Sequence, residues 1–130
     1  MGNKLVKALG VCGILLVGGI TYAGSSSSQV VSIWTDSAGL QNANGTLKAT
    51  RDSADATQYI GCSRYAYDTG SNFVICYARS AAGAYQSCQT SDASMMRVAE
   101  TLNPASYLYF VTNTDGTCDR VITVAASFDL

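Results

Sequence analysis

The sequence contains no histidine. A Ser-His-Asp or Cys-His catalytic arrangement is therefore impossible, and so is a histidine-rich metal site. Lysine and glutamate are almost as scarce, because Lys48 is the one lysine after residue 23 and Glu100 is the one glutamate of the chain. With no recognisable catalytic constellation, the sequence predicts no enzyme, and it gives no reason to expect a catalytic residue, a metal or a cofactor.

Positive charge is sparse as well. Lys and Arg together number 8 against 9 Asp and Glu, and two of the eight, Lys4 and Lys7, lie at the N-terminus. Nucleic-acid binding needs a clustered positive field, and so does binding to an anionic membrane surface. We therefore expect neither nucleic acid nor membrane as a partner.

The first 23 residues resemble a secretory signal peptide. The two N-terminal lysines form a positive n-region, and Leu9 to Ile20 is an apolar core that glycines dilute. Thr21-Tyr22-Ala23 then places small residues where a signal peptidase reads them. The core is shorter than the roughly 20 apolar residues of a membrane anchor. We expect cleavage after residue 23, a flexible Gly/Ser leader over 24–28 and a single small exported domain over 29–130.

Four cysteines remain after such cleavage: Cys62, Cys76, Cys88 and Cys118. Their spacing contains no C-x₂₋₄-C knuckle, and export places them in an oxidising compartment, so the pattern favours two disulfides over zinc. Two consecutive hairpins, turning at 68–72 and about Ala82, place the first three cysteines in one row across neighbouring strands. Spacing alone leaves all three pairings open. We prefer Cys62–Cys76 with Cys88–Cys118.

Alternating apolar and polar residues predict short strands with turn-forming residues between them. The segment 35–45 is expected to be a loop with a turn at Asn44-Gly45. An Asp-Gly turn at residues 115–116 would pair Phe110 with Val121 and Leu108 with Thr123. The predicted strands cover residues 29–34, 47–51, 59–67, 73–79, 85–89, 107–111 and 120–128.

One helix is predicted after the third cysteine. Ser91 or Asp92 caps it, an apolar stripe follows at i, i+3, i+4 and i+7 spacing, and Asn103-Pro104 ends it. The stripe consists of Met95, Val98, Ala99 and Leu102. We expect an α+β fold in which a mostly antiparallel β-sheet, a meander plus a C-terminal hairpin, carries one packed helix and is stapled by disulfides.

Asn113-x-Asp115-Gly116-Thr117-x-Asp119 alternates oxygen ligands in the manner of a calcium loop. An EF-hand wants glycine at the sixth position and glutamate at the twelfth, whereas here glycine is fourth and Val124 is twelfth. A hairpin turn explains the same residues, so we expect no metal there.

Tyrosine is the remaining conspicuous feature. Tyr59, Tyr65 and Tyr67 share one side of one predicted strand, and Trp34 is a candidate fourth member. Tyr and Trp suit recognition surfaces because they combine a large rigid area with a polar tip. They are also common strand residues that pack for structural reasons. These four residues form our candidate binding face.

Three motifs carry a resemblance: RDSADATQYIGC, C-x-A-R-x-A-x-G-x-x-x-S-C, and SYLYF followed by TDGTC. Together they are similar to an uncharacterised family of small secreted proteins of Gram-negative bacteria that have a four-cysteine framework. The resemblance spans about residues 51–127. It implies export to the periplasm or the medium and a shared cysteine framework, and it brings no activity and no catalytic residues.

The first functional hypothesis is an exported, non-enzymatic binding module for a protein or glycan of the cell envelope or medium. The alternative is a periplasmic inhibitor of an envelope-directed hydrolase, which a protruding loop at 68–72 would favour. Third come a small carboxylate-dependent hydrolase and a self-assembling structural subunit, since exposed strand edges can polymerise.

Overall fold

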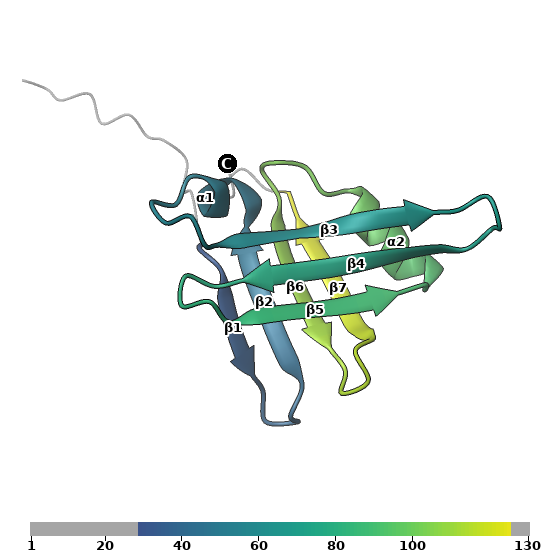
Figure 1. Cartoon of the computed structure of the whole chain (residues 1–130), viewed down its shortest axis with the longest axis horizontal. Coiled ribbons are helices and arrows are strands. Elements are labelled where there is room, and N and C mark those ends of the chain that lie inside the picture. Colours follow the sequence, from purple (N-terminus) through teal and green to yellow (C-terminus); the bar gives the residue numbers. More distant parts are fainter. Residues whose placement is uncertain (1–28, 126–130) are drawn as a thin grey trace, which may run out of the picture.

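Two antiparallel sheets pack against each other, and their strands cross at a steep angle (Figure 1). The computed structural model describes residues 29–125, so the predicted signal peptide and leader and the last five residues lie outside the described part of the chain. The four-stranded sheet has the order β1-β2-β6-β7, and the three-stranded sheet has the order β3-β4-β5. The elements are β1 (Ser32–Thr35), β2 (Gln41–Thr46), α1 (Leu47–Arg51), β3 (Tyr59–Ala66), β4 (Asn72–Arg79), β5 (Tyr85–Thr90), α2 (Ala93–Glu100), β6 (Tyr107–Thr112) and β7 (Cys118–Val124).

The predicted fold class is confirmed: the structure is mostly antiparallel sheet with packed helix and two disulfides. The strands are divided between two sheets, where one was expected. Side chains from the facing sides of both sheets form the core, which includes Ile60, Val74, Leu108, Phe110 and Val121. No helix within residues 29–125 is long and apolar enough to cross a membrane.

All four hairpins of the described chain close with the same five-residue turn. In each, the first residue's N–H donates to the fifth residue's carbonyl, and the N–H of a glycine at the fourth position donates back to the first residue's carbonyl. The glycine takes a positive φ, between 80° and 88°, which L side chains rarely adopt. This is a type I turn followed by a glycine bulge. The turns are Asp36–Leu40, Tyr67–Ser71, Ser80–Ala84 and Asn113–Thr117.

This turn explains why the predicted residue pairs of the C-terminal hairpin are right and its predicted turn is wrong. The predicted pairs Phe110↔Val121 and Leu108↔Thr123 are confirmed. The two-residue Asp-Gly turn is wrong, because the turn spans one residue more and a register shift between Val111 and Thr112 compensates for it.

β2 corrects the loop and turn that were expected at 35–45. Asn44-Gly45 lies inside a buried central strand between β1 and β6. The small residues Ala43 and Gly45 pair with the large residues Phe110 and Leu108, so β2 leaves room for β6. A side chain at Gly45 would bring its Cβ to 3.4 Å from the Cα of Val31. A side chain at position 45 would therefore lie in close contact with Val31, the residue before β1, and with Thr50.

The side-chain amides of β2 can be buried because they are hydrogen-bonded. Asn42 is 2% exposed; its Nδ2 donates to Asp36 and to the Leu40 carbonyl, and its Oδ1 accepts from the Tyr109 hydroxyl. Asn44 accepts from Gln29 Nε2 at 3.1 Å. Burial of a hydrogen-bonded amide carries little penalty, so a polar segment can form a central strand.

The segment after β2 corrects a second prediction. Residues 47–51 form the short helix α1, where a strand was expected. Leu47 donates its N–H to the Ser106 carbonyl, and Lys48 pairs with Asp52 one turn on. An i, i+4 ion pair of this kind supports a helix and is absent from a strand.

α2 agrees with the prediction at its start and ends earlier than expected. Asp92 is the N-cap, and its side chain accepts from the Met95 N–H at 2.9 Å. Ala99 is buried in the core, and the other members of the predicted stripe pack around it. The helix ends at Glu100 with Thr101 as C-cap, ahead of the expected Asn103-Pro104 boundary.

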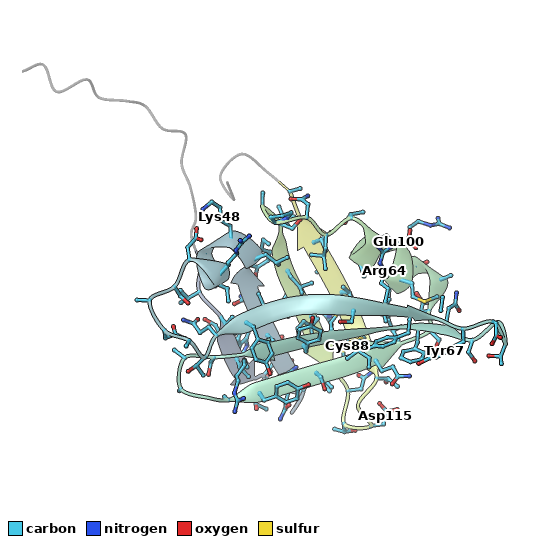
Figure 2. All side chains as sticks on the ribbon, turned by 45° about the horizontal axis from the view of Figure 1, so that its top comes forward. Lys48, Arg64, Tyr67, Cys88, Glu100 and Asp115 are labelled. Carbon is cyan, nitrogen blue, oxygen red and sulfur yellow. A yellow bond between two sulfur atoms is a disulfide. The ribbon has the colours of Figure 1, made fainter. Side chains whose placement is uncertain are left out.

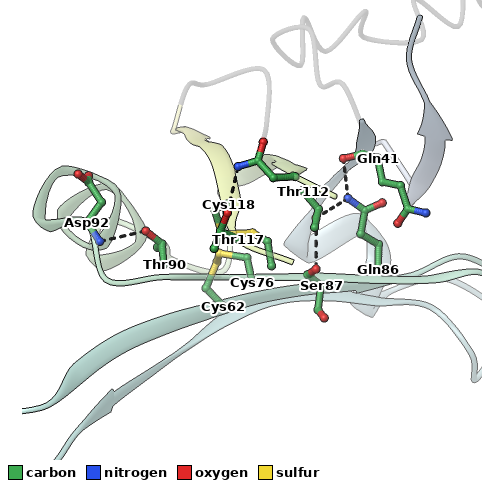
Figure 3. Close-up of a disulfide and its surroundings, with 12 residues drawn as sticks. Gln41, Cys62, Cys76, Gln86, Ser87, Thr90, Asp92, Thr112, Thr117 and Cys118 are labelled. Carbon is green, nitrogen blue, oxygen red and sulfur yellow. Dashed lines mark hydrogen bonds between the residues drawn. A yellow bond between two sulfur atoms is a disulfide. The ribbon is translucent and has the colours of Figure 1, made fainter. Parts of the chain in front are cut away.

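The preferred disulfide pairing is confirmed, with bridges Cys88–Cys118 and Cys62–Cys76. Figure 3 labels Cys62 and Cys76 in their surroundings. Cys76 faces both Cys62 and Cys88 across its neighbouring strands, as expected. The alternation set by the turns makes Cys62↔Cys76 a non-hydrogen-bonded pair, in which side chains stand closer than in the hydrogen-bonded pair Cys76↔Cys88. Two bridges indicate that the chain folds in an oxidising, extracellular environment.

Candidate binding face

The outer side of the three-stranded sheet carries a row of aromatic rings. Burial alternates along β4 and β5, with buried residues facing the four-stranded sheet. The intervening residues and the odd-numbered residues of β3 therefore point outward. We call the six outward rings the aromatic face; they are Tyr59, Tyr65, Tyr67, Phe73, Tyr77 and Tyr85.

The rings of the aromatic face hold one another in place. Phe73 stacks on two tyrosines, with its ring centroid 4.8 Å from that of Tyr65 and 6.1 Å from that of Tyr67. Tyr59 meets Tyr77 edge to face at 5.9 Å. Rings that are already ordered lose little rotamer entropy when a partner binds.

Gly61 and Ser63 position the ring of Tyr77. Gly61 pairs with Tyr77 across the strands, and a Cβ at Gly61 would lie 3.7 Å from the tyrosine oxygen. The ring therefore lies over the glycine, and the Ser63 hydroxyl donates to the Tyr77 oxygen at 3.2 Å. The ring covers backbone that would otherwise be exposed on this face.

The face is nearly uncharged. Among the outward residues of β3, β4 and β5, Arg79 is the one charged side chain; the other non-aromatic residues include Ser63, Ile75, Ser87 and Gln89. Four tyrosines of the face are substantially exposed, from 39% at Tyr59 to 55% at Tyr85. Protein interfaces are enriched in Tyr and Arg and depleted of other charges at their centre, and paratopes combine Tyr with Ser.

The structure separates the four predicted face residues. Tyr59, Tyr65 and Tyr67 lie together on the aromatic face, and Figure 2 shows Tyr67 toward the far end of the β3–β4 hairpin. Trp34 lies on β1, in the other sheet, where its ring stacks parallel to Tyr109 at 6.1 Å. Trp34 is therefore not part of this face, because strand membership of a sheet was not visible in the local pattern.

Sequence reasoning also missed three members of the face. They lie on β4 and β5 and are Phe73, Tyr77 and Tyr85. A signal for them existed: the correctly predicted hairpin register places Phe73 directly opposite Tyr65 and Tyr77 opposite Gly61. Carrying that register across all three strands would have found the face.

Three of the described carboxylates accept hydrogen bonds from their own loops or turns. The pKa of Asp55 is lowered to about 2 by hydrogen bonds from the Gln58 side chain and from backbone N–H groups. The pKa of Asp36 is lowered by Asn42 and the Leu40 N–H, and that of Asp115 by the hydroxyl and N–H of Thr117. A general acid near neutral pH needs a raised pKa, so these groups do not fit that role.

Metal chemistry finds no support in the described residues. Within residues 29–125, no group of three or more Cys, Asp and Glu side chains is placed to hold a metal ion. Asp115, from the calcium-like stretch, accepts from Thr117 within the hairpin turn. Glu100 lies 4.0 Å from Arg64, and both side chains are largely exposed.

Comparisons with protein-family models, with curated proteins and with solved structures found no match. The resemblance to secreted proteins of Gram-negative bacteria therefore stays a prediction and assigns no residue a role.

Proposed function

We propose that this is an exported, non-enzymatic binding module of the periplasm or medium that holds a protein partner on its aromatic face. The observation that carries the proposal is the pre-ordered, nearly uncharged row of six rings across β3, β4 and β5. A contiguous exposed apolar patch on a small domain is characteristic of an interaction site. Export is supported by the predicted signal peptide and the two disulfides.

A protein is a better partner for this face than a glycan. The central rings stack on one another, so Phe73 already uses stacking surface that a sugar ring would need. Arg79 is the face's one charged group, and no carboxylate accompanies it on β3–β5 to bind sugar hydroxyls. A Tyr-rich surface with a single Arg suits a flat polypeptide epitope.

The test replaces Tyr59, Tyr65 and Tyr67 together with serine. Oxidised wild-type and variant proteins serve as bait for envelope extract and for purified cell-wall polysaccharide. The control variant is Ile122→Ser, because Ile122 is similarly exposed, at 43%, on the outer side of the other sheet. We expect one stoichiometric protein partner on wild type and control and its loss on the triple variant, with circular dichroism unchanged.

Two outcomes contradict the proposal. Retention of the same partner by the triple variant would show that the face does not bind it. Retention of polysaccharide without any protein would identify a glycan-binding module.

The inhibitor hypothesis has one observation in its favour. The tip of the β3–β4 hairpin, residues 66–72, is exposed throughout, and in Figure 1 it extends to one end of the molecule. An inhibitor that inserts this tip into a hydrolase would lose activity when Asp68 and Thr69 are both replaced with alanine, while Gly70 keeps the turn intact. Binding through the aromatic face predicts that this variant retains its partner.

A further inference from the structure

The edge of β3 is open along its second half. The Tyr67 N–H donates to the Ser71 carbonyl at 2.9 Å, which fixes the alternation of the β3–β4 ladder. Residues 63 and 65 therefore exchange hydrogen bonds with β4, and the N–H and C=O groups of Cys62, Arg64 and Ala66 point away from it. Within the described chain, no hydrogen bond reaches those outward groups.

Parts of the other sheet edges are covered by specific contacts. At β5, Gln89 donates its N–H to the Gly116 carbonyl at 3.0 Å. Where the chain enters β1, the Val31 N–H is capped by the Gln58 side chain at 3.0 Å. α2 packs along β7. Proteins commonly cover their edges in these ways. Within the described chain, the outward backbone groups of Ile33 and Thr35 on β1 are open as well. The edge of β3 has in addition a cleft beside it.

On both sides of the sheet, side chains next to the open edge of β3 could contact a bound segment. On the outer side stands Tyr65, stacked on Phe73. On the inner side a cleft of about 200 Å³ lies between the hairpin and α2, with Val74 and Met96 in its lining. Arg64 and Glu100 also line this cleft, and Figure 2 shows them close together beside α2.

We propose that the edge of β3 between Cys62 and Ala66 binds an extended segment of a partner protein as an added strand, with an apolar side chain of that segment in the cleft beside Met96. A row of free N–H and C=O groups at two-residue spacing is complementary to another polypeptide strand and to few other ligands. Side chains of an added strand alternate, so one set meets Tyr65 and the other meets the cleft. This inference rests on the proposed protein-binding function and names the form in which the partner is held.

Arg64 argues against a second copy of this chain as the occupant. Two-fold antiparallel pairing centred anywhere from Ser63 to Tyr65 places Arg64 opposite, or diagonally next to, the same arginine of the other copy. Like charges in those positions destabilise a strand pair. A different polypeptide avoids this repulsion.

The test uses a displayed library of random twelve-residue peptides, selected on the oxidised full-length protein. The blocking variant is Ala66→Pro, with Ala66→Ser as its matched control. Proline at position 66 removes an outward N–H and leaves the ladder to β4 intact, as proline on an edge strand does. We expect selected peptides to bind wild type and Ala66→Ser alike and to bind Ala66→Pro about tenfold more weakly.

A second measurement covers the case in which Ala66→Pro fails to fold. Each selected peptide is N-methylated at successive residues and titrated against the wild-type protein. Strand addition predicts that methylation weakens binding at every second residue only. Equal sensitivity at all positions, or at none, would overturn the proposal.

Three further outcomes count against strand addition. They are an empty selection, equal binding to Ala66→Pro and Ala66→Ser, and a wild-type dimer in sedimentation that Ala66→Pro dissociates. If the envelope partner is lost on the triple tyrosine variant and kept on Ala66→Pro, strand addition is wrong and the binding face stands. If the triple variant keeps the partner, the proposed function itself fails.

Discussion

The repeated five-residue turn predicts how the fold responds to loss of its glycines. The perturbation is alanine at the fourth position of one turn, for example Gly70→Ala. Gly70 has φ +86°, and nothing lies within 4 Å of the Cβ that alanine would add. The change therefore introduces no clash, and its effect is confined to backbone conformation.

The magnitude follows from two opposing terms. A left-handed conformation costs an L residue about 1–2 kcal/mol. Alanine also lowers the entropy of the unfolded chain, which offsets about 0.4–1 kcal/mol. We expect a net loss of about 1 kcal/mol in the free energy of unfolding, which lowers Tm by roughly 4–8 °C in a domain of this size.

The assay is thermal and urea unfolding of the oxidised protein, with asparagine at the same position as the matched comparison. Asparagine tolerates the left-handed region, so Gly70→Asn should be closer to wild type than Gly70→Ala. A further comparison is Gly45→Ala, whose effect would be steric, since its Cβ meets Val31 and Thr50 at 3.4 Å. Equal stability of wild type and Gly70→Ala, or greater loss with asparagine than with alanine, would refute the reasoning.

Two other predictions concern the stability contributed by the disulfides and the loss of stability at low pH. Replacing Cys88 and Cys118 with alanine should destabilise the protein more than replacing Cys62 and Cys76. The first bridge joins residues 30 apart and the second joins residues 14 apart. Loss of unfolded-chain entropy gives about 3.7 kcal/mol for the longer loop and about 3 kcal/mol for the shorter one. Urea unfolding that ranks the two double variants the other way contradicts this. The folded pKa of Asp55, about 2, is below its ordinary value of 3.8. The ionised Asp55 therefore stabilises the folded state above pH 3.8, and this stabilisation is lost as pH falls through about 2. In acid titrations followed by circular dichroism, Asp55→Asn should lose less stability than wild type across that window, and identical acid profiles would count against the assignment.

The hairpins were predictable because their information is local. Turn residues and alternation fix the register of β3 with β4, and that register alone places Cys62 opposite Cys76. The choice of bridge needed one more fact, the hydrogen-bonded or non-hydrogen-bonded character of each pair, which depends on the turn type.

The position of β2 was not predictable in the same way. Its Asn and Gly residues favour a turn by local propensity. They form a central strand because Asp36, Tyr109 and Gln29 satisfy the amides and because β6 needs small residues opposite its large ones. Those partners come from other strands, and the local pattern contains no trace of them.

The candidate site was found in part for a related reason. Tyr59, Tyr65 and Tyr67 share one strand, so alternation placed them on one side. Trp34 is a predicted member of the binding face only because tryptophan suits recognition surfaces. The division into two sheets puts it on a different surface. Division of strands between sheets depends on long-range packing, which no single segment encodes.

Site-specific photo-crosslinking tests the central claim most directly. Benzoylphenylalanine replaces Tyr85, which is 55% exposed on the aromatic face, or Ile122 on the outer side of the other sheet. Both proteins are irradiated in envelope extract, and the products are identified by mass. The account predicts one protein adduct from position 85 and none from position 122. An adduct from position 122 alone would contradict it.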